Sequence, residues 1–164
     1  MFRHQLGTHQ KEDSLIYEET NPDFEVDVST SNSQEYITFN IKSLFEPKTN
    51  EIWFKHAKDE DTDFSLISPM QYGVNYSLKH GEQFFYKLTN EEDGINYKIV
   101  KIPLPTKYLL LSESNESSEY KPKDKNELDV IKNRNELQLF GSTELIKTNY
   151  DAKILDFEVT KHYM

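Results

Sequence analysis

Aromatic and lysine residues alternate through positions 76–101, and of all the patterns in the sequence this one could most readily bind a ligand. Aromatic rings beside lysines hold single-stranded nucleic acids, and each stacked base contributes roughly 1–3 kcal/mol. The alternative is that about half of the rings fill a core while the lysines cover its outer surface. Four acidic residues nearly balance the local charge, which favours this alternative. The aromatic residues are Tyr76, Phe84, Tyr86 and Tyr97, and the lysines are Lys79, Lys87, Lys98 and Lys101. We expect at most weak direct nucleic-acid contact, through Lys87, Tyr97, Lys98 and Lys101.

The sequence contains no motif that is specific for catalysis, metal binding or phosphate binding. The acidic residues between Asp59 and Asp63 alternate as in a calcium loop, but the glycine and the final glutamate of such a loop are missing. The histidines lack the spacing of a metal site, and there is no cysteine. No GxSxG, GxxxxGK or GxGxxG pattern occurs. We therefore expect a protein without a metal or cofactor that is not an enzyme.

Length, composition and charge indicate one folded domain that covers residues 1–164. Aromatic residues make up 13% of the 164 residues, so a core can form although only 35% of the chain is apolar. The net charge is −10, and residues 12–64 alone contribute four lysines and fourteen acidic residues, 4 − 14 = −10. Nucleic-acid binding depends on clustered Lys or Arg, so this distribution argues against tight binding. It suits solubility, or contact with a basic protein partner.

The sequence lacks the features of a secreted or membrane protein. No apolar run approaches the roughly 20 residues of a transmembrane helix. Residues 1–13 are polar, lack the apolar centre of a signal peptide, and are expected to form a loose lead-in. We expect an intracellular protein without membrane contact.

Alternating apolar and polar residues predict mainly antiparallel β-structure. The clearest hairpin joins 24–28 to 36–41, and a short strand follows at 51–57. We expect a first strand at 14–19, a loop at 58–73, and a second hairpin in which 84–88 pairs with 95–99. An exposed loop at 112–125 leads into a short helix at 122–133, and the last two strands are 135–141 and 154–159.

One short helix before a final pair of strands matches the oligonucleotide/oligosaccharide-binding barrel, the OB-fold. We therefore predict a single antiparallel barrel with one or two short helices, and a β-sandwich is the alternative. In the barrel, the inward-facing residues of the last two strands are Leu137, Leu139, Leu155, Phe157 and Val159. Replacing Phe157 with Ala would then cost about 3–5 kcal/mol.

The stretch NELDVIKNRNELQLFGSTELIKTNYDAKILDFEV, residues 126–159, resembles the smallest OB-fold subunit of the telomere-capping CST complex and the small accessory subunit of telomerase holoenzymes. The resemblance implies a nuclear, non-enzymatic barrel that binds a larger OB-fold protein in a hetero-oligomer. Aromatic residues dominate interface energetics, so the candidate partner-binding residues are Trp53, Phe54, Phe85, Tyr86 and Tyr108. The alternative function is a viral, phage or bacterial β-sandwich that acts as a structural or immunity-type interaction protein.

Overall fold

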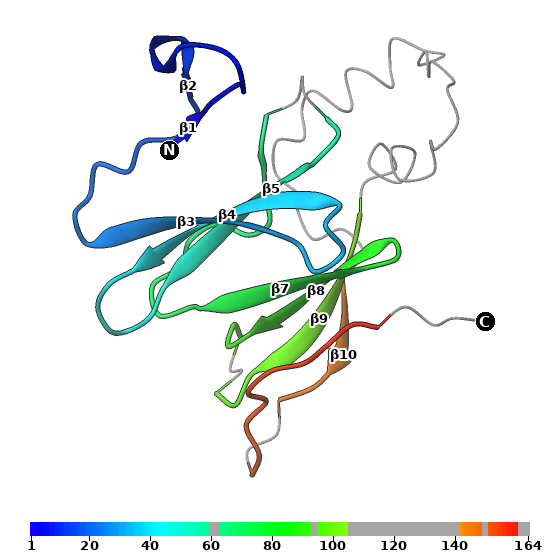
Figure 1. The fold of residues 1–164 in the computed structure, drawn as a ribbon. Coiled ribbons are helices and arrows are strands. Elements are labelled where there is room, and N and C mark those ends of the chain that lie inside the picture. Colours follow the sequence, from blue (N-terminus) through cyan, green and yellow to red (C-terminus); the bar gives the residue numbers. More distant parts are fainter. Residues whose placement is uncertain (60–62, 93–94, 105–141, 149–150, 161–164) are drawn as a thin grey trace, which may run out of the picture.

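Two four-stranded antiparallel sheets form the body of the molecule. The computed structural model describes residues 1–59, 63–92, 95–104, 142–148 and 151–160. In both sheets, strands that are neighbours in the sequence are also neighbours in space, so each sheet is a simple meander (Figure 1). The first sheet contains β3 (Phe24–Thr30), β4 (Tyr36–Ser43), β5 (Asn50–His56) and β6 (Ser65–Leu66). The second contains β7 (Tyr76–Gly81), β8 (Phe84–Thr89), β9 (Lys98–Pro103) and β10 (Thr143–Ile146).

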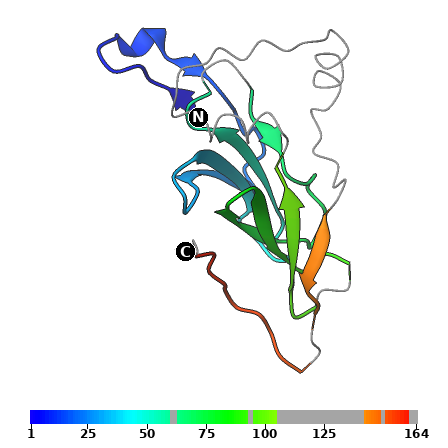
Figure 2. The same ribbon diagram turned by 90° about the vertical axis from the view of Figure 1, so that its right-hand side faces the viewer.

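A small ladder precedes the two sheets and projects away from them in both views (Figures 1 and 2). It consists of β1 (Phe2–Arg3) and β2 (Ser14–Leu15), with a 3-10 turn at Gln10–Glu12 between them. All four strand residues are exposed, so the predicted lead-in contains short regular elements but no core. Among the described residues, no helix is long and apolar enough to cross a membrane.

The strongest predicted hairpin is confirmed in the first sheet. The β3 and β4 strands pair in the register that the alternation requires, with Val26 opposite Ile41 and Val28 opposite Phe39. Along β5, buried and half-buried residues alternate without interruption, as expected for a strand between two neighbours in a sheet whose one face is covered. The strand predicted at 51–57 is therefore also confirmed.

The core lies between the two sheets, which pack face to face. Tyr36 and Phe54 come from the first sheet and Phe85 from the second, and none of the three is more than 2% exposed. The Phe85 ring centroid lies 5.1 Å from that of Tyr36 and 4.9 Å from that of Phe54, in edge-to-face geometry. Such contacts add to the hydrophobic gain from burial and fix how the sheets sit on each other.

The mainly β, antiparallel prediction is confirmed, but the closed barrel is not found. The described strands form separate sheets with free edges, an arrangement that is compatible with the β-sandwich alternative. The physical reason lies after β5: only two residues of β6 pair with it, and the chain then crosses to begin a new sheet at β7. Hydrophobic alternation specifies which face of a strand is buried, but not which other strand it meets.

The final strand predicted at 154–159 is not a strand in the structure. Residues 151–160 return from the β10 side toward β7 as an extended but irregular segment (Figure 2). Leu155 is 81% exposed, whereas Phe157 and Val159 are half-buried, so the predicted inward-facing set does not share one core. The helix at 122–133, the loop at 112–125, Leu137 and Leu139 lie outside the described residues.

Two shorter predictions are corrected in detail. The predicted loop at 58–73 contains β6, which pairs with β5. In the second hairpin the return strand begins at Lys98 rather than at Ile95, which is 70% exposed. Tyr97, just before β9, has a φ of 67°, and this left-handed conformation interrupts the ladder there.

Candidate functional site: the contact between the two sheets

Two asparagines of the first sheet bond to the free backbone edge of β7 in the second sheet. Asn50 Nδ2 donates to the carbonyl oxygen of Tyr76 at 2.8 Å, and the Tyr76 N–H donates to Asn50 Oδ1 at 2.8 Å. Asn32, from the turn between β3 and β4, makes the same pair of bonds with His80, at 2.9 and 2.7 Å. Each side-chain amide thus replaces the backbone of a missing neighbouring strand, which satisfies an edge that would otherwise be open.

The two asparagine contacts differ in burial. Asn50 is 2% exposed and also donates to Asn40 Oδ1 at 2.9 Å, whereas Asn32 is exposed. Backbone groups of alternate residues in a strand point to the same edge, so the N–H and C=O of Leu78 face the same edge of β7 as those of Tyr76 and His80. Neither amide bonds to the groups of Leu78, so Leu78 separates the two contacts.

Tyr36 lies between two buried histidines at the end of the core. Its ring centroid is 5.2 Å from that of His56 and 4.7 Å from that of His80, and both histidines are at most 2% exposed. His56 Nδ1 accepts a hydrogen bond from the Lys58 N–H, while its Nε2 is buried and has no hydrogen-bond partner in the described structure. Burial, which disfavours the charged ring, lowers the pKa of His56.

A serine, a histidine and a glutamate meet near this cluster, but not in the geometry of a catalytic triad. Ser33 Oγ lies 2.7 Å from His80 Nδ1, and Glu35 Oε2 lies 4.0 Å from the same nitrogen. In a triad the hydroxyl and the carboxylate bind opposite ring nitrogens, so that one orients the ring while the other gives up its proton. Ser33 Oγ is also within hydrogen-bond distance of Ser31 Oγ and accepts from the Glu35 N–H. This group therefore supports the β3–β4 turn.

The candidate lysines Lys87 and Lys98 are buried in ion pairs. Lys87 Nζ donates to Glu91 at 2.5 Å and to Ser68 at 3.1 Å, and the lysine is 1% exposed. Lys98 is 6% exposed and pairs with Glu92 at 2.9 Å and Glu144 at 3.5 Å.

These contacts also govern the charge of Lys98. Burial alone would lower the pKa of Lys98, but the bonds and charges of Glu92 and Glu144 raise it. In return, Lys98 lowers the pKa of the Glu92 carboxyl. The sequence pattern suggested exposed lysines, yet the folded chain has paired them internally.

The remaining candidate partner-binding residues do not share one surface. Phe54 and Phe85 are in the core between the sheets. Trp53 is half-buried on the opposite face of the first sheet, where it stacks on Phe39 with centroids 5.9 Å apart. Tyr86 is half-buried on the outer face of the second sheet, where Lys101 Nζ lies 3.6 Å from the Phe84 ring centroid. Tyr108 lies outside the described residues.

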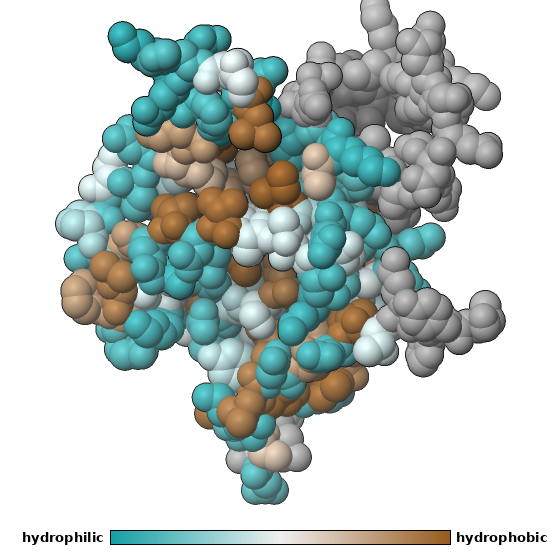
Figure 3. Space-filling model, viewed as in Figure 1, coloured by the Kyte–Doolittle hydropathy of each residue, from teal (hydrophilic) through white to brown (hydrophobic). Residues whose placement is uncertain are grey.

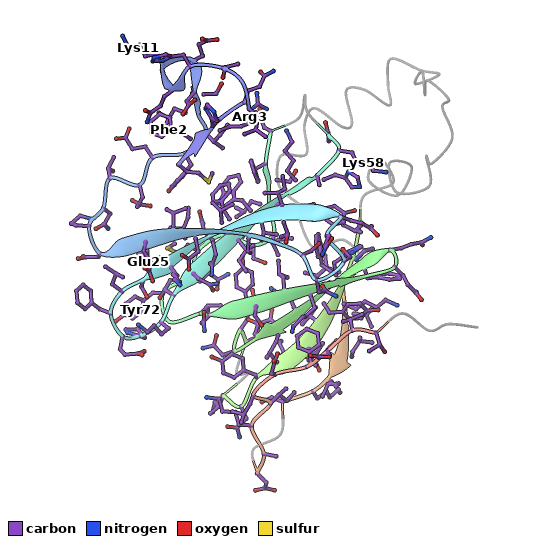
Figure 4. All side chains as sticks on the ribbon, in the orientation of Figure 1. Phe2, Arg3, Lys11, Glu25, Lys58 and Tyr72 are labelled. Carbon is purple, nitrogen blue, oxygen red and sulfur yellow. The ribbon has the colours of Figure 1, made fainter. Side chains whose placement is uncertain are left out.

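Exposed apolar residues are spread over the surface. One face shows several separate apolar patches among hydrophilic residues (Figure 3). Tyr72 is 86% exposed, and its side chain points away from the sheets at the edge of the molecule (Figure 4). The part of the chain that the structure describes contains no group of three or more His, Asp or Glu residues that could hold a metal ion.

Sequence reasoning missed the asparagines and the histidine cluster. Asn50 lies just before the predicted strand at 51–57 and is the first residue of the observed β5, and its neighbours in sequence give no signal of its contact with Tyr76. His56 and His80 are 24 residues apart in the chain (80 − 56) and meet only because both sheets pack on Tyr36.

Comparison with known proteins explains the two meanders. Residues 1–153 match the family model described as prolyl oligopeptidase, N-terminal β-propeller domain. Protease 2 of Moraxella lacunata is 32% identical over 107 residues, which are 63% of this chain. Dipeptidyl aminopeptidase BI of Pseudoxanthomonas mexicana is 28% identical over 101 residues, 61% of this chain. The chain spans only 14% and 13% of the lengths of these two relatives.

Solved structures give the same result. Oligopeptidase B from Leishmania major matches with a TM-score of 0.55 and 27% identity, over 62% of this chain and 14% of that chain. Oligopeptidase B from Trypanosoma brucei, with covalently bound antipain in its closed form, matches with a TM-score of 0.54 and 26% identity over the same shares. A propeller consists of four-stranded sheets arranged around a central channel, and each sheet described above has this composition.

These findings overturn the functional predictions made from the sequence. The resemblance to CST or telomerase subunits is wrong, because the relatives are peptidases and the matching family is a propeller domain. The DNA-handling OB-fold function is wrong for the same reason, and so is the predicted intracellular, nuclear location. The viral, phage or immunity-type alternative is not supported either. The match over residues 1–153 shows that this chain belongs to the prolyl oligopeptidase N-terminal β-propeller family.

Proposed function

We propose that the two sheets are consecutive blades of the propeller of an oligopeptidase, and that this chain contributes to the wall of its central channel without performing catalysis. The observation that carries the proposal is the face-to-face pair of four-stranded meanders in a chain whose residues 1–153 match the propeller family. In a propeller, each blade packs on the next through one face, and the first strand of each blade lies nearest the channel. By this reasoning β3 and β7 line the channel.

The asparagine contacts support this arrangement. They join the first sheet to the first strand of the second, which is where neighbouring blades must keep a fixed angle. The chain passes from β6, the last strand of the first sheet, to β7, the first strand of the second. This is the connection expected between two blades, in which the outer strand of one blade leads to the inner strand of the next.

The side chains of the described residues support a non-catalytic role. Within the described ranges, the one place where a serine, a histidine and a carboxylate meet has both oxygen groups on the same nitrogen of His80. A chain of this kind would act together with the catalytic part of an oligopeptidase, in the same polypeptide or in another. That catalytic part takes the place of the larger protein partner expected from the sequence.

The experiment has two measurements. The purified chain is incubated with a panel of fluorogenic short peptides, beside oligopeptidase B from Leishmania major as a positive control. We expect no turnover by the chain alone. Turnover that disappears in a Ser33→Ala variant would reject the non-catalytic assignment.

The second measurement tests the propeller role. An oligopeptidase B from which the region aligned with this chain has been deleted is mixed with the purified chain and separated by size-exclusion chromatography. We expect the two to elute together, because the deletion leaves blade faces uncovered. A mixture that elutes as two separate species, with a correctly folded chain by circular dichroism, would contradict the role as blades.

A further inference from the structure

A cavity lies where the starts of β5 and β7 meet residues 153–155. Its volume is 360 Å³. Its polar lining comes from both sheets and from the returning segment, and comprises Asn40, Asn50, Asn75, Ser77, Tyr97 and Lys153. The apolar part of the wall is Leu88, Ile154 and Leu155. We propose that this cavity binds a carboxylate that carries an aliphatic group.

No acidic side chain among the described residues neutralises the positive charge at the cavity. Lys153 Nζ lies 5.2 Å from the ring centroid of Tyr97, which it approaches from the ring face. Within the described ranges, no carboxylate oxygen is within 4.0 Å of this ammonium group. An unpaired cation beside a concave surface attracts an anion of matching size.

Three asparagines line the cavity together with Lys153, and two of them, Asn40 and Asn75, keep donors available. Asn40 Oδ1 accepts from Asn50 Nδ2, so the Asn40 amide is oriented and keeps its own N–H groups for a ligand. Asn50, at 2% exposure, is fixed by its bonds to Tyr76 and acts as the buried support of this wall. The Asn75 backbone is fixed by the bond from its N–H to Asn90 Oδ1, and its side chain makes no bond in the described structure. The side-chain amides of Asn40 and Asn75 thus offer donors in the same cavity that Lys153 lines.

Tyr97 occupies a backbone conformation that large side chains rarely adopt. Its φ of 67° costs on the order of 1–3 kcal/mol, and strain of this kind concentrates at ligand sites. The ring of Tyr97 lines the cavity and faces the ammonium group of Lys153. The hydrogen bond from the Ile154 N–H to the Asn96 carbonyl, at 3.0 Å, holds the two segments together.

The lining therefore selects for a ligand with two parts. A carboxylate meets the ammonium group and the amide donors, and charge-assisted bonds of this kind are the stronger ones. An aliphatic group attached to it contacts Leu88 and Ile154. The C-terminal residue of a peptide and a free aliphatic carboxylic acid share this chemistry. The proposal goes beyond the role as propeller blades and does not depend on it.

The test is calorimetric titration of the purified chain with matched pairs of acid and amide. N-acetyl-leucine is compared with N-acetyl-leucinamide, and a short peptide that ends in leucine is compared with its C-terminal amide. We expect at least one acid to bind about tenfold or more tighter than its amide, and the difference to shrink as salt screens the charge. Binding of both acids assigns a site for free carboxylates, and binding of the peptide acid alone assigns a site for peptide ends.

Variants decide whether the cavity is responsible. Lys153→Met is expected to lower the affinity for the acid about tenfold or more, and Lys153→Arg to retain most of it. Lys147→Met is the matched control, because Lys147 is also exposed but does not line the cavity. Equal binding of acid and amide, no binding of either acid, or full binding by Lys153→Met would each overturn the proposal. None of these outcomes bears on whether the chain joins a peptidase, so failure of this proposal and failure of the blade role are distinguishable.

Discussion

Replacing Asn50 with Ala should destabilise the chain more than any other single amide substitution in the described structure. Asn50 is 2% exposed and satisfies both the N–H and the C=O of Tyr76, which is itself 3% exposed. A buried backbone group without a partner costs about 1–3 kcal/mol, so the two groups together predict a loss of about 2–6 kcal/mol. The expected loss is large because both Asn50 and the Tyr76 groups it bonds are almost completely buried in the folded chain.

Asn32→Ala is the matched control, since Asn32 bonds to His80 in the same way but is exposed. Water can replace its amide, so we expect only the net value of ordinary hydrogen bonds, about 0.5–1.5 kcal/mol. Urea unfolding of both variants and the parent chain measures the difference, provided that the m-value stays the same. The two variants therefore test burial separately from hydrogen-bond number.

Asn50→Asp refines the same test. The carboxylate still accepts from the Tyr76 N–H, but it cannot donate to the Tyr76 carbonyl and places a charge at a buried site. We expect this variant to recover part of its stability at acidic pH, where the protonated group can donate again. Equal losses in Asn50→Ala and Asn32→Ala, or a loss below about 1 kcal/mol for the former, would refute the reasoning.

Three further outcomes follow from the packing of the chain. Burial lowers the pKa of His56 in the folded chain below its value in the unfolded chain. The stability that neutral His56 contributes is therefore fully present above a pH of about 6.5. It is lost as the pH falls through the folded-state pKa, because the unfolded chain then binds the proton more readily. Urea unfolding at several pH values should show this loss, each unit of depression corresponding to about 1.4 kcal/mol, and His56→Phe should flatten the curve. In Gly81→Ala the new Cβ would lie 2.2 Å from Val159 Cγ1, so the segment 151–160 must move away from β7. We expect proteases to cut this segment faster, while the free energy of unfolding of the sheets changes by less than about 1 kcal/mol. Unchanged proteolysis would show that the segment does not rest on β7. Phe157→Ala should cost only about 1 kcal/mol in a thermal or urea assay, because the ring is half-buried and its cation contact to Lys79 is 6.0 Å long. A loss of about 3 kcal/mol or more would show that Phe157 is a core residue, as the sequence predicted.

Local alternation in the sequence predicted most of the strands of the first sheet but not how the strands assemble. The β3–β4 hairpin and β5 follow from the period-two pattern, because the apolar face of each strand must be buried, no matter which element covers it. The same pattern at 154–159 was misleading, since a strand needs a neighbour for its backbone and residues 151–160 are not part of either sheet. The choice between a barrel and paired sheets depends on strand partners, and residue alternation does not specify these.

The candidate site was less predictable for a related reason. Lysines 87 and 98 were read as surface cations, but each is neutralised by a glutamate only four or six residues away, once β8, β9 and the loop between them place the charges together. The asparagine contacts, the histidines around Tyr36 and the cavity at Lys153 all join residues from different elements. No local spacing encodes such contacts.

By itself, the sequence determined that this protein is mainly antiparallel β-structure with an aromatic core and no recognisable catalytic motif. These properties depend on composition and on neighbours along the chain, which the sequence states directly. Only the tertiary structure decided that the strands form two meanders packed face to face, that two asparagines bond to the edge of β7 at Tyr76 and His80, and that two lysines are buried. These properties depend on contacts between residues that are far apart in the chain, and such contacts exist only after the hydrophobic faces of both sheets have met.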